Sequence, residues 1–270
     1  MIKQGEINSI AGKTGVRDTQ IEKDYVLSWV LWCISKSPYL KENLVFKGGT
    51  VLRKVYFPKY RFSEDLSFTF KGDFEVNAIK SAFAELIKLV HDASRITLSL
   101  QHENQKKTGN FNFYISFTSP LGGPANKDIK TDITKDELIC NAPEMKPVLN
   151  EYSDLVNEKY EVLCYTLDEI AAEKMCSVMQ RTMPRDIYDL WYLFEMDGYD
   201  IEDCIFSFRE KAAFKKLDAK NFVKVIEKKE SVFAKQWKDH LSHQIAPLPE
   251  FRKVWRELGR HWKKLQRFAE

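Results

Sequence analysis

Two glycines that follow a short apolar segment are the first feature of this sequence with evident chemical potential. Gly48 and Gly49 stand between an apolar segment, residues 44–46, and a segment, residues 51–57, whose apolar residues recur at helical spacing. A buried strand, a tight turn and the start of a helix bring backbone N–H groups toward one point, which favours an anion. The pattern predicts a phosphate-binding turn, with Pro58 ending the helix.

Two aspartates in alternating segments are candidate metal ligands. Asp65 lies on the polar side of its segment together with Ser63 and Ser67, and Asp132 lies on the polar side of another alternating segment, 128–134. Carboxylates on neighbouring strands beside a phosphate-binding turn suit a site for Mg²⁺ or Mn²⁺ with a nucleotide. The alternatives are a solvated strand residue for Asp65 and an exposed strand-edge residue for Asp132.

Four polar side chains near the turn are predicted to bind the nucleotide. Thr50 and Arg53 lie in the first turns of the helix and would contact the triphosphate. Ser63 and Ser67 share the polar face of the strand that carries Asp65. A serine hydroxyl can hydrogen-bond a phosphate or a metal-bound water, but it contributes no charge.

Lys174 occupies a position where a lysine is unusual. Within the expected helix 167–181, it falls inside the apolar stripe that includes Ile170, Met175 and Val178. A lysine on a buried face needs an anionic partner. We favour a bound triphosphate as that partner. The alternatives are a neighbouring carboxylate and a side chain that snorkels to solvent.

Asp186 and Asp189 lie three residues apart on the next expected helix, 184–196, and therefore share a face. Pro184 at the first helical position puts Asp186 in the first turn, where a carboxylate is favourable without any function. Asp189 lies deeper in the helix and could pair with Arg185. Both are candidate catalytic residues, and Asp189 is the stronger candidate for orienting a substrate.

The order of these motifs resembles a known family. The segments are Phe46-Lys47-Gly48-Gly49-Thr50, Arg61-Phe62-Ser63-Glu64-Asp65-Leu66, Lys130-Thr131-Asp132-Ile133, Leu167-Asp168-Glu169-Ile170-Ala171-Ala172-Glu173-Lys174 and Arg185-Asp186-Ile187-Tyr188-Asp189-Leu190. They resemble the motifs of the AbiEii/AbiGii-type nucleotidyltransferase toxins, of the DNA polymerase β-like superfamily. One position departs from the superfamily, which usually has a second carboxylate where this chain has Ser67. A standard two-metal site is therefore in doubt.

The resemblance implies a function. It implies transfer of NMP from an NTP to an acceptor, with RNA such as a tRNA acceptor end as the target in some relatives. It also implies the toxin of a bacterial toxin–antitoxin or phage-defence pair, with a cognate antitoxin as partner. Because of Ser67, the alternative hypothesis is a nucleotide-binding module that transfers nothing.

The expected fold class is α+β, in two domains. Residues 1–165 are expected to form a polymerase β-like nucleotidyltransferase core with an N-terminal helix and a mixed sheet. Residues 166–270 are expected to form a helical bundle that completes the active-site cleft. Strands are expected at 44–46, 63–70, 95–101, 111–117, 128–134 and 160–165, and helices at 19–35, 51–57, 73–91, 167–181, 184–196, 201–214, 219–230, 231–243 and 249–268. A capping box of Thr19 and Glu22, a glycine- and proline-rich loop at 120–124 and an irregular segment at 141–158 complete the prediction.

Composition limits the class of protein. The chain has 270 residues, of which 44% are hydrophobic, which is enough for a substantial core. Its five scattered cysteines favour a reducing compartment over a disulfide framework or a zinc site. No signal peptide or apolar run long enough for a bilayer is present. We therefore expect a soluble, cytoplasmic protein that does not bind a membrane.

The last expected helix is strongly basic on one side. The net charge of the chain is only +3, so a nucleic-acid partner does not follow from overall charge. The local basic side chains are Arg252, Lys253, Arg256, Arg260, Lys263, Lys264 and Arg267. Three interpretations stay open: a solvated face, a track for an RNA backbone, and a docking site for an acidic protein.

Overall fold

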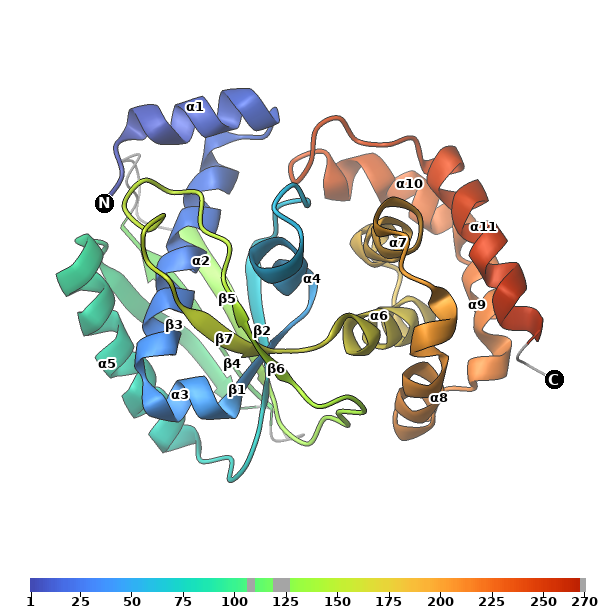
Figure 1. Ribbon diagram of the computed structural model, residues 1–270, viewed down its shortest axis with the longest axis horizontal. Coiled ribbons are helices and arrows are strands. Elements are labelled where there is room, and N and C mark those ends of the chain that lie inside the picture. Colours follow the sequence, from blue (N-terminus) through green and yellow to red (C-terminus); the bar gives the residue numbers. More distant parts are fainter. Residues whose placement is uncertain (106–109, 119–126, 268–270) are drawn as a thin grey trace. The chain divides into compact units, whose positions relative to one another are not determined.

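The computed structural model describes residues 1–105, 110–118 and 127–267. The chain divides into two compact units (Figure 1). Unit 1 comprises Met1–Glu137 and Pro143–Cys164, and unit 2 comprises Leu138–Ala142 and Tyr165–Glu270. The loop predicted at 120–124 lies outside the described residues.

Unit 1 is built on one seven-stranded mixed sheet in the order β3-β4-β5-β2-β1-β7-β6. The strands are β1 (Leu44–Lys47), β2 (Asp65–Phe70), β3 (Leu98–Gln105), β4 (Phe111–Phe117), β5 (Lys127–Thr134), β6 (Glu144–Pro147) and β7 (Glu161–Cys164). The β2–β5 and β1–β7 pairs are parallel, and the other neighbouring pairs are antiparallel. The predicted strands are confirmed with small shifts at their ends. β6 is an addition inside the segment that was predicted to be irregular.

The helices of unit 1 are α1 (Gln4–Thr14), α2 (Asp18–Lys36), α3 (Pro38–Asn43), the short α4 (Gly49–Val51) and α5 (Val76–Ser94). The sequence did not predict α1, because its amphipathic pattern is weak and Ile7 is its one buried residue. The predicted capping box is wrong. α2 begins after Arg17 without a side-chain cap, and the Glu22 carboxylate is instead buried against the ammonium of Lys127.

The sheet has one apolar face and one polar face, as the alternation of β2, β4 and β5 predicts. A row of register partners on the apolar face is fully buried, and it consists of Phe46, Phe68, Ile133 and Phe111. α2 and α5 pack against each other and cover this face (Figure 1). The ring of Phe83 on α5 lies 4.9 Å from that of Phe113 on β4. The polar face is thereby left to the predicted site residues.

Unit 2 contains the helices α6 (Leu167–Gln180), α7 (Pro184–Trp191), α8 (Ile205–Phe214), α9 (Phe222–Glu227), α10 (Glu230–Leu241) and α11 (Phe251–Arg267). These confirm the helical segments predicted after residue 166. A π-helical turn (Tyr192–Asp197) extends α7, and short 3₁₀ turns (Ile201–Cys204 and Ala219–Asn221) precede α8 and α9. Among the described residues, no helix combines the length and apolarity needed to cross a bilayer.

A buried ion pair explains why residues 138–142 belong to unit 2. The Nζ of Lys211 lies 2.6 Å from Oε1 of Glu169, and neither side chain is exposed. Lys211 also donates to the carbonyl of Leu138. Glu169 accepts hydrogen bonds from the backbone N–H groups of Cys140 and Asn141. Each polar group thus has a partner in a place where an unpaired charge would be costly.

The amphipathic character predicted for α11 is confirmed. Its buried side chains are Phe251, Val254, Leu258, Trp262 and Leu265. Its exposed basic side chains include Arg252, Lys253, Arg256 and Lys263. Arg260 pairs with Glu195 at 2.8 Å, and Lys264 pairs with Asp200 at 3.2 Å. Part of the positive charge is therefore neutralised within unit 2, while an RNA track or an acidic partner remains a prediction.

Candidate functional site

The backbone at Gly48 requires a glycine. Its φ is +85°, which L side chains rarely adopt. A Cβ built on Gly48 would lie 3.5 Å from the Cβ of Ser67, which is ordinary van der Waals contact, so the φ angle and not a lack of space selects glycine. The tight turn predicted between β1 and the following helix is therefore confirmed. That helix passes from α4 into a π-helical segment, Leu52–Tyr56, and ends before Pro58 as predicted.

Two hydroxyls next to the turn hold the start of β2. Oγ1 of Thr50 lies 2.5 Å from the carbonyl oxygen of Asp65 and 2.8 Å from Oγ of Ser63. Both side chains are buried. Thr50 and Ser63 therefore fix the backbone that carries Asp65. Direct contact of these two hydroxyls with a nucleotide stays a prediction.

Rows of register partners bring the predicted metal ligands together on the polar face. One row consists of Lys47, Ser67, Asp132 and Asn112, on β1, β2, β5 and β4. The adjacent row consists of Asp65, Lys130 and Tyr114, and it lies two residues closer to the N-terminal ends of β2 and β5. Asp65 and Asp132 thus lie diagonally on neighbouring strands, about 8 Å apart at Cα. Their pairing on one face was predicted from the alternation of the two segments.

Asp132 already has two partners on the polar face. Its Oδ2 lies 2.5 Å from the Nζ of Lys130, and its Oδ1 lies 3.3 Å from Nδ2 of Asn112. The side chains of Lys130 and Asp132 are 39% and 31% exposed, so this ion pair is weak. A divalent cation can replace the ammonium at the carboxylate without a large penalty.

The polar face can hold one hard cation when a nucleotide supplies further ligands. Mg²⁺ needs six oxygen ligands and is usually held by one or two carboxylates with phosphates and waters. Asp65 and Asp132 provide two carboxylates, and Ser67 between them provides a neutral oxygen. Within the described ranges, no three carboxylate, histidine or cysteine side chains converge as a metal site. The donor set therefore fits one metal ion better than two.

Lys47 was not among the residues predicted from the sequence. It is the register partner of Ser67, is 5% exposed, and its Nζ lies 3.6 Å from Oε2 of Glu137. A buried cation beside Ser67 contributes positive potential on the polar face. The available signal was a lysine that ends an apolar strand directly before Gly48.

Arg53 lies in an internal ion-pair network. Its guanidinium donates to Asp24 at 3.2 Å and to the carbonyl of Tyr60 at 2.8 Å, pairs with Glu151, and stacks 3.5 Å over the ring of Phe62. Only 5% of Arg53 is exposed. These contacts anchor the helix to α2. Direct contact of Arg53 with a nucleotide stays a prediction.

Asp24 is the centre of this network and was missed in the sequence. It is fully buried, and it pairs with Lys54 at 2.5 Å as well as with Arg53, and accepts from the hydroxyl of Tyr152 at 2.6 Å. Burial favours the neutral acid, but Lys54 and Arg53 outweigh it and hold the pKa of Asp24 below its usual value. The network stabilises the segment that follows the glycine turn.

Unit 2 holds a second charged cluster. The Nζ of Lys174 on α6 lies 2.8 Å from Oδ1 of Asp186 and 2.6 Å from Oδ2 of Asp189, both on α7. Lys174 is 6% exposed, and neither aspartate is exposed. The favoured partner, a bound triphosphate, is not what the ammonium contacts in this structure, because α7 packs on α6 and supplies two carboxylates. The alternative of a neighbouring carboxylate is confirmed.

Arg181 completes this cluster. Its Nε and Nη2 lie 2.7 and 3.1 Å from the carboxylate of Asp186. Burial opposes the charge on Asp186, but Lys174 and Arg181 outweigh that effect and hold the pKa of Asp186 below its usual value. Asp186 thus has two cationic partners. Asp189 pairs with Lys174 and takes part in further interactions with its surroundings.

Comparison with known families identifies the chain. Residues 29–259 match the family described as the nucleotidyl transferase AbiEii toxin of type IV toxin–antitoxin systems. The chain belongs to this AbiEii family. The matched range contains the site residues of both units, from Gly48 to Asp189, and leaves out α1.

Solved structures support the same fold. MenT4, a nucleotidyltransferase toxin from Mycobacterium tuberculosis, superposes with a TM-score of 0.67 at 16% identity, over 97% of this chain and 89% of that one. A candidate nucleotidyltransferase from H. pylori superposes with a TM-score of 0.61 at 16% identity, over 94% and 97% of the two chains. Comparison with the sequences of curated proteins gives no significant match. This AbiEii-family chain thus has the polymerase β-like nucleotidyltransferase fold predicted from its motifs.

Proposed function

We propose that this AbiEii-family protein transfers an NMP group from an NTP to an acceptor hydroxyl with the help of Mg²⁺ or Mn²⁺. The observation that carries the proposal is the placement of Asp65 and Asp132 on one polar face, beside the tight turn at Gly48. Carboxylates for a cation and backbone N–H groups for phosphate are the two requirements of phosphoryl-group chemistry.

The residues of unit 1 have separate roles in this proposal. The backbone at Gly48 and Gly49 approaches the phosphates, while Thr50 and Ser63 hold the start of β2. Asp65 and Asp132 would hold the cation, and Ser67 would position a water or a phosphate oxygen. The bound cation would supply charge neutralisation at the triphosphate. Lys130, released from Asp132, would then face the anionic substrate.

The reaction balances without a further reactant. The acceptor oxygen forms a bond to the α-phosphorus, and the bond from that phosphorus to the bridging oxygen breaks. Pyrophosphate leaves with the electron pair, and the hydroxyl proton passes to water. Buried and partly buried cations such as Lys47 and Lys130 favour the charge that develops on the phosphates.

In unit 2 we propose catalytic roles for Lys174, Asp186 and Asp189. The two carboxylates hold the ammonium in one position. A cation that is already held in place needs little reorganisation when a substrate binds. Its three N–H donors can serve both aspartates and one further oxygen. Asp189 would orient the ammonium, and Asp186 would be held in turn by Arg181.

The biological role that we propose is that of a cytoplasmic toxin. Family membership supports a toxin–antitoxin context with a cognate antitoxin, and the exposed basic side of α11 is compatible with an RNA acceptor. The five cysteines are free, which is compatible with a reducing compartment.

One assay tests the proposal. The protein is incubated with each labelled NTP, Mg²⁺ and total cellular RNA, and both pyrophosphate release and labelled RNA are measured. Label on RNA that depends on Mg²⁺ and is lost in Asp65→Asn supports transfer. The neutral Ser67 keeps a second hypothesis, a module that binds a nucleotide and transfers nothing. Binding of an NTP by calorimetry without pyrophosphate release with any acceptor would support that second hypothesis.

A further inference from the structure

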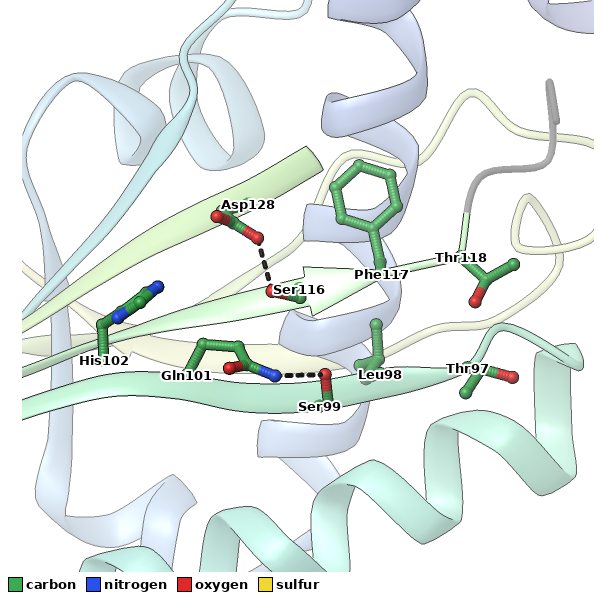
Figure 2. A pocket seen from close by; sticks show the side chains of 9 residues that line it. All are labelled: Thr97, Leu98, Ser99, Gln101, His102, Ser116, Phe117, Thr118 and Asp128. Carbon is green, nitrogen blue, oxygen red and sulfur yellow. Dashed lines mark hydrogen bonds between the residues drawn. The ribbon is translucent and has the colours of Figure 1, made fainter. Parts of the chain in front are cut away.

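A polar pocket lies on the outer strands of the sheet in unit 1 (Figure 2). Its volume is about 280 Å³, and it lies over β3, β4 and the start of β5. The side chains of Ser99, Gln101, Ser116 and Asp128 contribute its polar wall, and Leu98 and Phe117 contribute an apolar part. None of these residues belongs to the site described above.

The pocket continues the polar face that carries Asp65 and Asp132. Asp128, Ser116 and Ser99 are register partners and form a third row beyond the row of Asp65 and Lys130. Asp128 lies four residues before Asp132 on the same strand and the same face, about 13 Å away. One substrate molecule can therefore touch both the pocket and the proposed reaction centre.

The chemistry of the lining selects against polyphosphate. Among the described residues that line the pocket, one side chain is acidic and none is lysine or arginine. Ser116 lies 2.5 Å from Oδ1 of Asp128, and Nε2 of Gln101 lies 3.3 Å from Oγ of Ser99, so these groups hold one another in place. Hydroxyl, amide and carboxylate groups suit a ligand with neutral N–H or O–H donors, such as a nucleoside.

A β-bulge shapes one wall of the pocket. The register between β3 and β4 shifts between Gln101 and Asn104, so two residues of β3 face one residue of β4. His102 lies in this bulge with φ +50° and turns its ring edge-on to Tyr114, with centroids 6.0 Å apart. Backbone strain of this kind often occurs where a side chain is aimed at a ligand. The bulge and the positive φ of His102 thus indicate a ligand site independently of the polar lining.

We propose that this pocket is the acceptor subsite and binds one nucleoside unit of the molecule that receives the NMP group. The assignment rests on the proposed nucleotidyl transfer. The strand order puts the phosphate turn at β1, the metal carboxylates on β2 and β5, and the pocket on β5, β4 and β3. Attacking and leaving oxygens lie roughly in line at a transferred phosphorus. If pyrophosphate leaves toward the turn, the acceptor enters from the side of the pocket.

The size of the pocket limits what it holds. Small-molecule sites commonly measure ~300–1,000 Å³, and this pocket, at about 280 Å³, is just below that range. One base with its ribose is therefore the expected occupant, with Asp128 accepting from ribose hydroxyls or base N–H groups. The nucleoside can belong to an RNA strand or to a free mononucleoside. The two sources share this chemistry, and the two arms of the transfer assay distinguish them.

Binding is tested first, without catalysis. The ¹⁵N-labelled protein is titrated with adenosine, cytidine, guanosine and uridine, each alone, and backbone shifts are followed by NMR. We expect shifts centred on Ser99, Gln101, Ser116 and Asp128 for at least one nucleoside. The shifts should be lost in Ser99→Phe, which fills the pocket from an exposed position on the edge strand. Glu161→Phe, at an exposed position on β7, is the matched control. No shift at the pocket with any nucleoside at millimolar concentration overturns the proposal.

Steady-state transfer then tests the acceptor role, with an RNA oligonucleotide in one arm and a mononucleoside in the other. Ser99→Phe should raise KM for the acceptor at least tenfold and leave KM for the NTP unchanged. Asp128→Asn should raise it several-fold, while Asp73→Asn, an exposed carboxylate elsewhere in unit 1, should not. The arm with measurable transfer identifies the source. Unchanged acceptor KM in both pocket variants overturns the acceptor subsite. If the wild type transfers nothing to any acceptor, the proposed function fails instead, and the NMR titration still decides whether the pocket binds nucleosides.

Discussion

Ser67 on β2 and Asp132 on β5 are register partners in a parallel pair, and Lys47 on β1 is the partner of Ser67 on its other side. Ser67 therefore stands between a carboxylate and an ammonium. A second carboxylate at this position would add a metal ligand, but it would also face the negative charge of Asp132. In the proposed metal site, the serine would leave one charge fewer and would make metal binding depend on the nucleotide.

We predict that Ser67→Asp tightens Mg²⁺ binding to the nucleotide-free protein. The new carboxylate would be a third one beside those of Asp65 and Asp132. The nearby Lys47 would limit its repulsion from Asp132. Calorimetric titration with Mg²⁺ measures the change, and Ser67→Asn, which adds volume without charge, is the matched control. Two tightly held metal ions in the wild-type protein without nucleotide would contradict the one-metal interpretation.

Lys130→Met should also tighten Mg²⁺ binding, but only modestly. The substitution removes the cation that competes for Oδ2 of Asp132. Because the pair is more than one-third exposed on the lysine side, the gain corresponds to at most about 1 kcal/mol, or roughly fivefold in affinity. The same titration measures it. Weaker Mg²⁺ binding in Lys130→Met would mean that the ammonium does not compete with the metal.

Asp65→Asn should abolish transfer and leave the fold intact. Loss of one electrostatic catalytic group commonly costs ~2.7–4 kcal/mol, which corresponds to about 10²–10³-fold in rate. The matched control is Glu64→Gln, since Glu64 is the preceding residue and pairs with Lys23 at 2.9 Å, a contact outside the proposed metal site. Retention of more than about a tenth of the activity in Asp65→Asn would remove Asp65 from the metal site.

Alternation in the sequence was sufficient to predict the polar face. β2, β4 and β5 show period-two patterns with buried partners on one side, so Asp65 and Asp132 could be placed on the same face before their distance was known. The turn at Gly48 was also predictable from a local signal, because a positive φ there leaves glycine as the unstrained choice. The sequence pattern was therefore sufficient to predict features that depend on neighbouring residues in the chain.

Long-range ion pairs were not predictable in this way. The pairing of Arg53 with Asp24 joins residues on different helices, and no periodicity links them. The pattern around Lys174 indicated that an anionic partner was needed, but the identity of the partner depends on how α7 packs on α6. The pocket bounded by Ser99 and Asp128 arises only when β3, β4 and β5 are in register.

The stability of unit 2 should depend on the ionisation of Asp186. The folded-state pKa of this carboxyl lies below its ordinary value of 3.8 because its two cationic partners outweigh its burial. Its contribution to the free energy of unfolding is therefore present above about pH 4 and is lost as the pH falls below 3.8 through the lower folded-state value. Denaturant unfolding of the wild type and Asp186→Asn between pH 3 and 7 measures this. The stability difference between them should shrink as the solution becomes acidic, and a difference that does not change with pH would contradict the charged state of Asp186.

The Lys174 cluster gives the sharpest test of a structural against a catalytic role. Lys174→Met keeps the aliphatic volume and removes the ammonium that serves Asp186 and Asp189. Both aspartates are fully buried, so each loses a charge-assisted hydrogen bond in a place where it is costly. Breaking a buried pair from one side commonly costs about 3–5 kcal/mol. We therefore predict a fall in melting temperature on the order of 10 °C.

Two further variants separate stability from catalysis. Lys174→Met combined with Asp189→Asn removes one charge of each sign and should recover part of the lost stability, because one buried negative charge fewer faces the site of the lost ammonium. Lys174→Arg keeps the positive charge but not the compact ammonium, so it should melt closer to the wild type. If Lys174 also meets the substrate, transfer by Lys174→Arg falls by at least tenfold even where its fold is intact. An unchanged melting temperature in Lys174→Met would contradict the buried pairing, and full activity in Lys174→Arg would leave the lysine with a structural role alone.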